Sequence, residues 1–107
     1  MGATRNSVCK IVIPAGEYAA TKSENTTIKA WVKKDHATNV AARLVVYADT
    51  ALGITEQSAT KANDTDWEEL SITVQATNNT YPVIQAFLEV WYVAGTSNVY
   101  LGSVSQT

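Results

Sequence analysis

The sequence contains very few of the residues that build metal centres and covalent cross-links. Its 107 residues include one cysteine, Cys9, and one histidine, His36. A single cysteine forms no disulfide within its own chain, and zinc sites need several Cys or His ligands at short spacing. Cys9 lies between apolar residues, so we expect a small buried side chain. The alternative is a nucleophile paired with His36, which no pattern in the sequence favours over chance.

An excess of charge of one sign is also missing. Eight basic residues nearly balance ten acidic residues, and the formal net charge is −2. Proteins that bind nucleic acid or an anionic membrane usually present a basic patch, so we expect neither as a partner. The basic residues cluster only at Lys29, Lys33 and Lys34. We expect this cluster to be solvated at the edge of a sheet, where lysine discourages aggregation.

Long hydrophobic runs are absent as well. No apolar segment approaches the length that spans a bilayer, and the first ten residues, MGATRNSVCK, lack the apolar region of a signal peptide. We therefore expect a protein that acts where it is made, or a module cut from a larger secreted protein.

Alternation of polar and apolar residues is the strongest pattern that the sequence does contain. Successive side chains of a strand point to opposite faces, so residues 83 to 93 predict a long strand with two different faces. The apolar face comprises Ile84, Ala86, Leu88, Val90 and Tyr92. The other face comprises Val83, Gln85, Phe87, Glu89, Trp91 and Val93. The second set mixes large aromatic rings with an amide and a carboxylate, which is typical of a surface that binds something.

Further strands are predicted wherever β-branched and aromatic residues recur between turn signals. They cover residues 7 to 13, 26 to 34, 40 to 48 and 67 to 76, and a closing strand follows a turn at 94 to 98. The alanines of 40 to 48 also permit a helix, but the valines and the tyrosine favour a strand. Within 26 to 34, Trp31 falls on the lysine side, away from Ile28, Ala30 and Val32.

Turn signals separate these strands. They occur at Pro14-Ala15-Gly16, at residues 35 to 39 and at residues 78 to 82. The longest polar stretch is 49 to 66, in which Leu52 and Ile54 are expected to anchor a short strand. This rhythm of short strands predicts an all-β antiparallel sandwich that forms a single domain over residues 1–107, with residues 1–6 as an N-terminal extension.

Three segments carry a resemblance to a known family: TIKAWVKKD, DTDWEELSITV and NVYLGSVS. Together with the long alternating strand, they resemble the jelly-roll carbohydrate-binding modules and the wider galactose-binding-like fold, over roughly residues 7 to 106. The resemblance implies an antiparallel jelly-roll β-sandwich. Such modules occur on bacteriophage structural proteins and on secreted glycan-degrading enzymes.

The sequence departs from that family at two places. The closing strand of the family often supplies aspartates to a structural calcium, where this chain has Gly102 and Ser103. Glu24, Asp64 and Asp66 remain, and we expect ordinary loop carboxylates and no metal or other cofactor. The first strand of many members is expected to be short or absent here, so that another chain completes that edge.

The candidate site gathers the residues that fall opposite the core-facing parity of their strands. They are Trp31, Arg43, Tyr47, Gln85, Phe87, Glu89 and Trp91. If their strands share one sheet, they form an aromatic and polar surface. Such a surface suits a sugar, whose C–H face packs on rings while its hydroxyls bind polar groups. A protein partner and packing under loops are the alternatives. Trp67, at the start of its strand, is expected to cap the core.

The expected function is a non-catalytic module. Glu68 and Glu69 point to opposite faces of a strand and so do not flank one bond, and no phosphate loop or Ser-His-Asp pattern occurs. We expect a structural and adhesive protein of a virion surface, as a capsid decoration or tail-appendage domain. The alternative is an extracellular carbohydrate-binding module of a secreted enzyme. The expected partners are other virion proteins, further copies of the chain or surface glycans.

Overall fold

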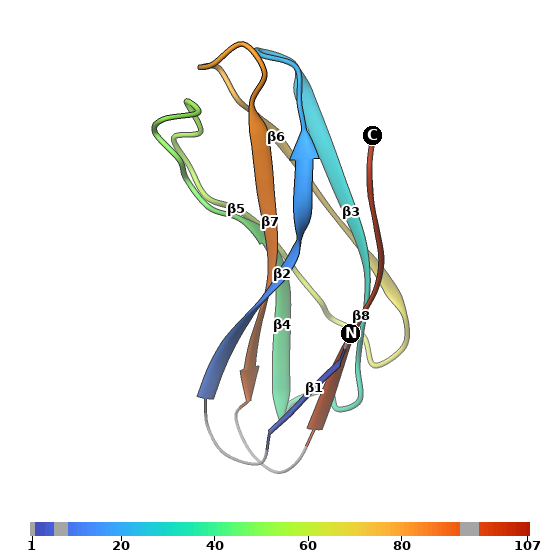
Figure 1. Cartoon of the computed structure of the whole chain (residues 1–107). Coiled ribbons are helices and arrows are strands. Elements are labelled where there is room, and N and C mark those ends of the chain that lie inside the picture. The colour runs from blue at the N-terminus through green and yellow to red at the C-terminus, as the bar shows by residue number, and fades with distance from the viewer. Residues whose placement is uncertain (1, 6–8, 93–96) are drawn as a thin grey trace.

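The chain folds into two antiparallel sheets that pack face to face (Figure 1). The computed structural model describes residues 2–92 except 6–8, and residues 97–107; residues 2–5 and Cys9 are described by their backbone alone. The strands are β1 Gly2–Arg5, β2 Cys9–Ala19, β3 Asn25–Lys34, β4 Val40–Val46, β5 Ser58–Lys61, β6 Glu68–Gln75, β7 Val83–Tyr92 and β8 Ser97–Gln106. The described part of the chain contains no helix that could cross a membrane.

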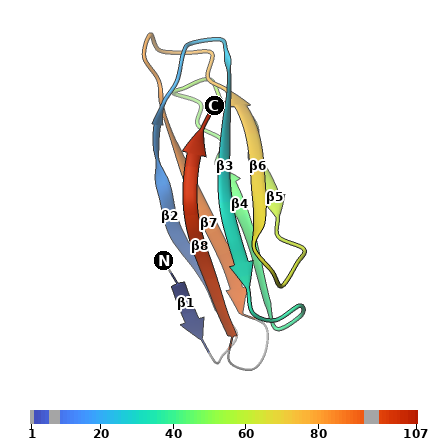
Figure 2. The same cartoon turned by 90° about the vertical axis from the view of Figure 1, so that its right-hand side faces the viewer.

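The order of the strands is that of a jelly roll. One sheet has the order β1-β8-β3-β6 and is called the β8 sheet; the other has the order β2-β7-β4-β5 and is called the β7 sheet. Figure 2 shows the β8 sheet from its outer side. Strands that follow one another in the sequence mostly change sheet, which is the double Greek-key connection of jelly rolls. The predicted fold class is confirmed.

The core lies between the two sheets and has the predicted parity. Its members from the β8 sheet include Ile28, Ala30, Val32, Leu70, Ile72 and Val74, all at most 6% exposed. Its members from the β7 sheet include Ala42, Leu44, Ile84, Ala86, Leu88, Val90 and Tyr92. Because a strand has a period of two, these inward positions leave the alternate residues on the two outer faces.

The turn signal at Pro14-Ala15-Gly16 predicted the end of a strand, but no strand ends there. β2 continues to Ala19, and its pairing with β7 shifts register between Pro14 and Gly16. The bulge has a positive φ of 116° at Gly16, a conformation that glycine adopts without strain. β2 is an edge strand, where proline is tolerated.

One expectation about strand edges is wrong, and a second needs correction in part. The lysine cluster is not at an edge, because β3 lies between β8 and β6. Lys34 is only 4% exposed, and its Nζ donates to the carbonyl of Ala37 over 3.2 Å. The expected extension of residues 1–6 contains β1, which pairs with β8 from Gly2↔Tyr100 to Arg5↔Ser97. The first strand is therefore short, as expected, but the chain itself supplies it beside β8.

The polar stretch 49 to 66 and Trp67 also differ from expectation. Leu52 and Ile54 form no strand; a single bridge joins Asp49 to Ile54, and the strand of this stretch is β5. Trp67 does not cap the core, since it is 45% exposed. Its ring lies on the outer side of the β8 sheet, over Gly102.

Candidate functional site

Six of the seven predicted site residues lie on one surface, the outer face of the β7 sheet. Arg43 and Tyr47 come from β4 and the residue after its end, and the other four come from β7. Trp31 is not among them, because β3 belongs to the β8 sheet. Its side chain, 41% exposed, lies on the opposite side of the sandwich. The single seven-residue surface is therefore divided between two faces.

Glu89 is the centre of this face. It is 1% exposed although its position on β7 points away from the core. Arg43, directly opposite on β4, donates from Nε to Oε1 of Glu89. The Tyr47 hydroxyl donates to Oε2, and Lys10 Nζ lies 3.0 Å from the same oxygen. A buried carboxylate needs such partners, because an unpaired buried charge is costly.

These partners decide the pKa values of the cluster. Burial raises the pKa of the Glu89 carboxyl, but the hydrogen bonds from Tyr47, Lys10 and Arg43 outweigh burial and leave that pKa below its ordinary value. Burial also raises the pKa of Tyr47, and the hydrogen bond to Glu89 adds to the effect, so that its pKa is about 12. At neutral pH the carboxylate is therefore ionised and the phenol is protonated.

Aromatic rings extend the cluster along β7. The cations of Lys10 and Arg43 lie 5.3 Å and 5.0 Å from the centre of the Trp91 ring, on which they make cation–π contacts. On the other side of Glu89, the rings of Tyr47 and Phe87 meet at 5.4 Å between centroids with a 47° tilt. Residues of the same face are thus held by one another, and the rings of Trp91 and Phe87 stay half-buried.

A shallow hollow of about 230 Å³ lies beside Phe87, over the bulge of β2. It is lined by Pro14, Gly16, Glu17, Gln85, Ala86 and Phe87. Gln85 Nε2 donates to Glu17 Oε1 over 3.0 Å, which fixes an amide and a carboxylate at the rim. An aromatic ring beside paired polar groups can hold a polar ring compound by packing and hydrogen bonding at once.

Sequence reasoning missed Lys10 and Glu17 on this face. Both belong to β2, where Lys10 is opposite Trp91 and Glu17 is opposite Gln85. The alternation of residues 10 to 13 can be read from the sequence, but the strand that pairs with these residues cannot. Cys9 falls in the same strand, and the prediction of a buried Cys9 side chain lies outside the described residues.

A second aromatic group occupies the outer face of the β8 sheet. Trp31, Trp67 and Tyr100 are 41%, 45% and 39% exposed. A Cβ at Gly102 would lie 3.0 Å from Cζ3 of Trp67 and 3.3 Å from Cβ of Trp31, so the glycine makes room for the Trp67 ring. A glycine within the closing strand was the sequence signal for this arrangement.

Glu68 and Asp64, near the start of β6, accept hydrogen bonds from backbone amides. Glu68 Oε2 accepts from the amides of Asn63 and Asp64, and Asp64 Oδ1 accepts from the amide of Thr65. No group of three or more His, Cys, Asp or Glu within the described residues could hold a metal ion. His36 caps its own turn, where Nδ1 accepts from the amides of Thr38 and Asn39.

The chain matches no protein-family model, and no curated protein or solved structure is significantly similar to it. The resemblance to jelly-roll carbohydrate-binding modules therefore stays a prediction, and function is argued from the surface itself.

Proposed function

We propose that the chain is a non-catalytic structural and adhesive module of a virion surface, and that it attaches to surface glycans through the outer face of the β7 sheet. One observation carries the proposal: aromatic rings on this face are held in place beside fixed polar groups. Trp91 is set by Lys10 and Arg43, and Phe87 adjoins the hollow with the Gln85–Glu17 pair. A binding surface that is already ordered loses little entropy when a ligand arrives.

The spacing along β7 suits an extended ligand. Phe87 and Trp91 share a face and are four residues apart, which corresponds to roughly 13 Å of strand. The hollow beside Phe87 has space for one small ring, and a chain of sugars could continue along the strand towards Trp91. Arg43 and Lys10 would then meet hydroxyl or acidic groups of the ligand.

A carbohydrate-binding module of a secreted enzyme is the second candidate. The resemblance carried by TIKAWVKKD and DTDWEELSITV favours it, and it would use the same face. The two candidates differ in what the module is attached to, so the neighbouring genes separate them: capsid and tail genes support the first, and a hydrolase domain supports the second.

Glycan retention tests the proposal. Wild type, Trp91→Ala and Phe87→Ala are passed over a glycan array and over insoluble polysaccharides. Because truncation of an anchor residue commonly costs about 2 kcal/mol, each variant should lose roughly 30-fold in affinity for any glycan retained. Trp31→Ala, an exposed tryptophan on the other sheet, is the matched control and should bind like wild type.

Two outcomes would overturn the proposal. One is wild type that is retained by no glycan on the array and no polysaccharide. The other is retention that Trp31→Ala abolishes and Trp91→Ala leaves intact, which would place the binding surface on the β8 sheet. Melting temperatures measured in parallel establish that each variant is folded. Release of reducing sugar from a retained polysaccharide would contradict the non-catalytic role.

A further inference from the structure

The two central strands of the β7 sheet separate before they end. The β4–β7 ladder stops at Val45↔Phe87, whereas β7 continues to pair with β2 as far as Ala19↔Val83. In Figure 1 the chain after β4 turns away from β7 into the loop that leads to β5. Within the described residues, the edge of β7 that faces β4 therefore has no strand partner beyond Phe87, over residues 83 to 86.

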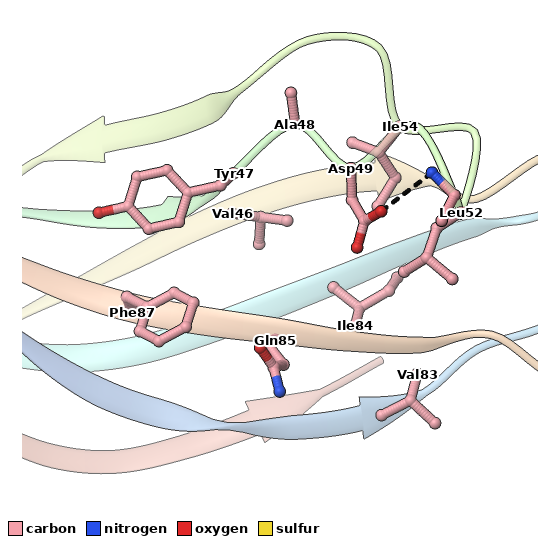
Figure 3. A pocket seen from close by; sticks show the side chains of 11 residues that line it. Val46, Tyr47, Ala48, Asp49, Leu52, Ile54, Val83, Ile84, Gln85 and Phe87 are labelled. Carbon is pink, nitrogen blue, oxygen red and sulfur yellow. Dashed lines mark hydrogen bonds between the residues drawn. The ribbon is translucent and has the colours of Figure 1, made fainter.

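A hollow of about 470 Å³ occupies the place that the ladder leaves. Continued in register, β4 would set Tyr47 opposite Gln85 and Asp49 opposite Val83. Instead these residues line the hollow from its two sides, with Leu52 and Ile54 of the loop also in its wall (Figure 3). Its volume lies within the range of about 300–1,000 Å³ that is usual for ligand sites.

The walls of the hollow are fixed by backbone hydrogen bonds. Asp49 and Ile54 exchange two, of 2.8 Å and 2.9 Å, and the amide of Asn78 donates to the carbonyl of Leu52 over 2.9 Å. The loop is thus tied both to itself and to the segment that precedes β7. The open space between β4 and β7 is therefore a built feature of the fold, ready to receive a ligand without rearrangement.

The open edge of β7 is suited to bind the main chain of an extended peptide. A strand edge presents N–H and C=O groups in a row, and a peptide in the β conformation supplies the complementary row. A peptide here would take the place that β4 leaves, between β7 and the loop. Leu52 and Val83, which both line the hollow and are not fully buried, offer apolar surface for one of its side chains.

Charge narrows the choice of peptide. Asp49 is the one charged side chain among the residues that line the hollow. Its Oδ1 accepts from the amide of Ala51 over 3.0 Å, and Figure 3 shows its second oxygen pointing into the hollow. A carboxylate in this position complements an arginine or lysine of the ligand by a charge-assisted hydrogen bond.

We infer that the space between β4 and β7 is a strand-addition site for an extended segment of a partner protein that carries a basic residue. The site adjoins the proposed glycan surface and shares Gln85 and Phe87 with it, but the glycan hollow lies on the β2 side of β7 and this one lies on the β4 side. A module with both would hold a glycan on one side of Phe87 and a partner chain on the other.

The test uses a synthetic eight-residue peptide of alternating threonine and valine with one central arginine, capped at both ends. Amide shifts of the labelled protein are followed by NMR during a titration, together with hydrogen exchange. Shifts should centre on residues 83 to 86 and on Asp49, and amides of that β7 segment should gain at least about tenfold protection. A peptide with glutamate in place of arginine, and one N-methylated at alternate amides, should each bind about tenfold or more weakly.

A matched pair of variants completes the test. Asp49→Asn keeps the acceptor for the Ala51 amide and removes the charge, so the arginine peptide should bind about tenfold more weakly. Asp64→Asn, another exposed loop carboxylate that accepts backbone amides, should leave binding unchanged. No shift at millimolar peptide overturns the inference, as does equal binding of the N-methylated peptide or an Asp49→Asn variant that binds like wild type. Failure of glycan retention leaves this result unaffected, since glycan retention is read at the rings of Trp91 and Phe87, whereas this test reads the charge of Asp49 and the main chain of residues 83 to 86.

Discussion

Arg43 and Glu89 face each other across β4 and β7 and join in an ion pair on the outside of the sheet, yet the Glu89 side chain is 1% exposed. A carboxylate at an outward position is normally solvated. Here Arg43, Tyr47 and Lys10 supply the hydrogen bonds that water would make. The outer face of the β7 sheet is therefore an ordered layer with its own polar centre.

Removal of Arg43 should destabilise the fold more than removal of Lys10. Arg43→Met leaves the buried Glu89 with one cation less and should cost about 2–3 kcal/mol. Lys10 is 45% exposed, so solvent screens its ion pair, and Lys10→Met should cost less than about 1 kcal/mol. Urea denaturation measures both. A larger cost for Lys10→Met than for Arg43→Met would mean that the carboxylate is held from the β2 side instead.

Acid should weaken the fold through Glu89. The pKa of this group is lower in the folded chain than its ordinary value of 4.5, so its contribution is complete above pH 4.5 and is lost as the pH falls through the folded pKa. Glu89→Gln should remove this part of the pH dependence. The difference in unfolding free energy between wild type and Glu89→Gln should therefore shrink below pH 4.5; a constant difference down to strongly acidic pH would contradict the assignment.

Alkali should weaken the fold through Tyr47. Its pKa rises from 10.0 to about 12 on folding, so the stabilisation is complete below pH 10 and is lost as the pH rises through 12. A phenolate beside the Glu89 carboxylate would place two negative charges together. Titration by phenolate absorbance should include a tyrosine that ionises near pH 12 and is missing in Tyr47→Phe. Tyr81→Phe, at a side chain that is 84% exposed, is the control variant and should leave the ionisation near pH 12 in place.

Much of the fold could be predicted because strand parity is a local property. The inward sets of β3, β4, β6 and β7 followed directly from alternation. The bulge at Gly16 could not be predicted, because the same residues build a turn when no partner strand lies alongside. In β2 the partner is β7, far away in the sequence, and pairing with it carries the strand through Pro14 to Ala19.

The candidate site was predicted in part for a related reason. Parity states which side of a strand a residue takes, but it does not state which sheet the strand joins. The jelly-roll order places β3 beside β8 and β6, which separates Trp31 from Trp91, and it places β2 beside β7, which adds Lys10 and Glu17. Trp67 was misplaced because it precedes its strand, where alternation no longer applies.

The contact between Trp67 and Gly102 leads to a final prediction, on how the exposed ring is held. The ring is 45% exposed, so Trp67→Ala should cost about 1–2 kcal/mol, less than the ~3–5 kcal/mol of a buried ring. In Gly102→Val the new Cβ would lie 3.0 Å from Cζ3 of Trp67, and the two methyl groups need further space. The ring should therefore swing outward at a cost of about 1 kcal/mol.

A double-mutant cycle by urea denaturation separates this contact from other effects of the two changes. If the ring is what Gly102→Val displaces, the valine should cost nothing in the Trp67→Ala background, where it also fits a strand better than glycine does. Trp67 fluorescence should shift to the red in Gly102→Val alone, because the displaced indole meets more water. If Gly102→Val costs the same with and without the Trp67 ring, the ring is not what the valine displaces. The valine would then clash with the backbone of β3, where the Trp31 carbonyl oxygen would lie 3.4 Å from its Cβ.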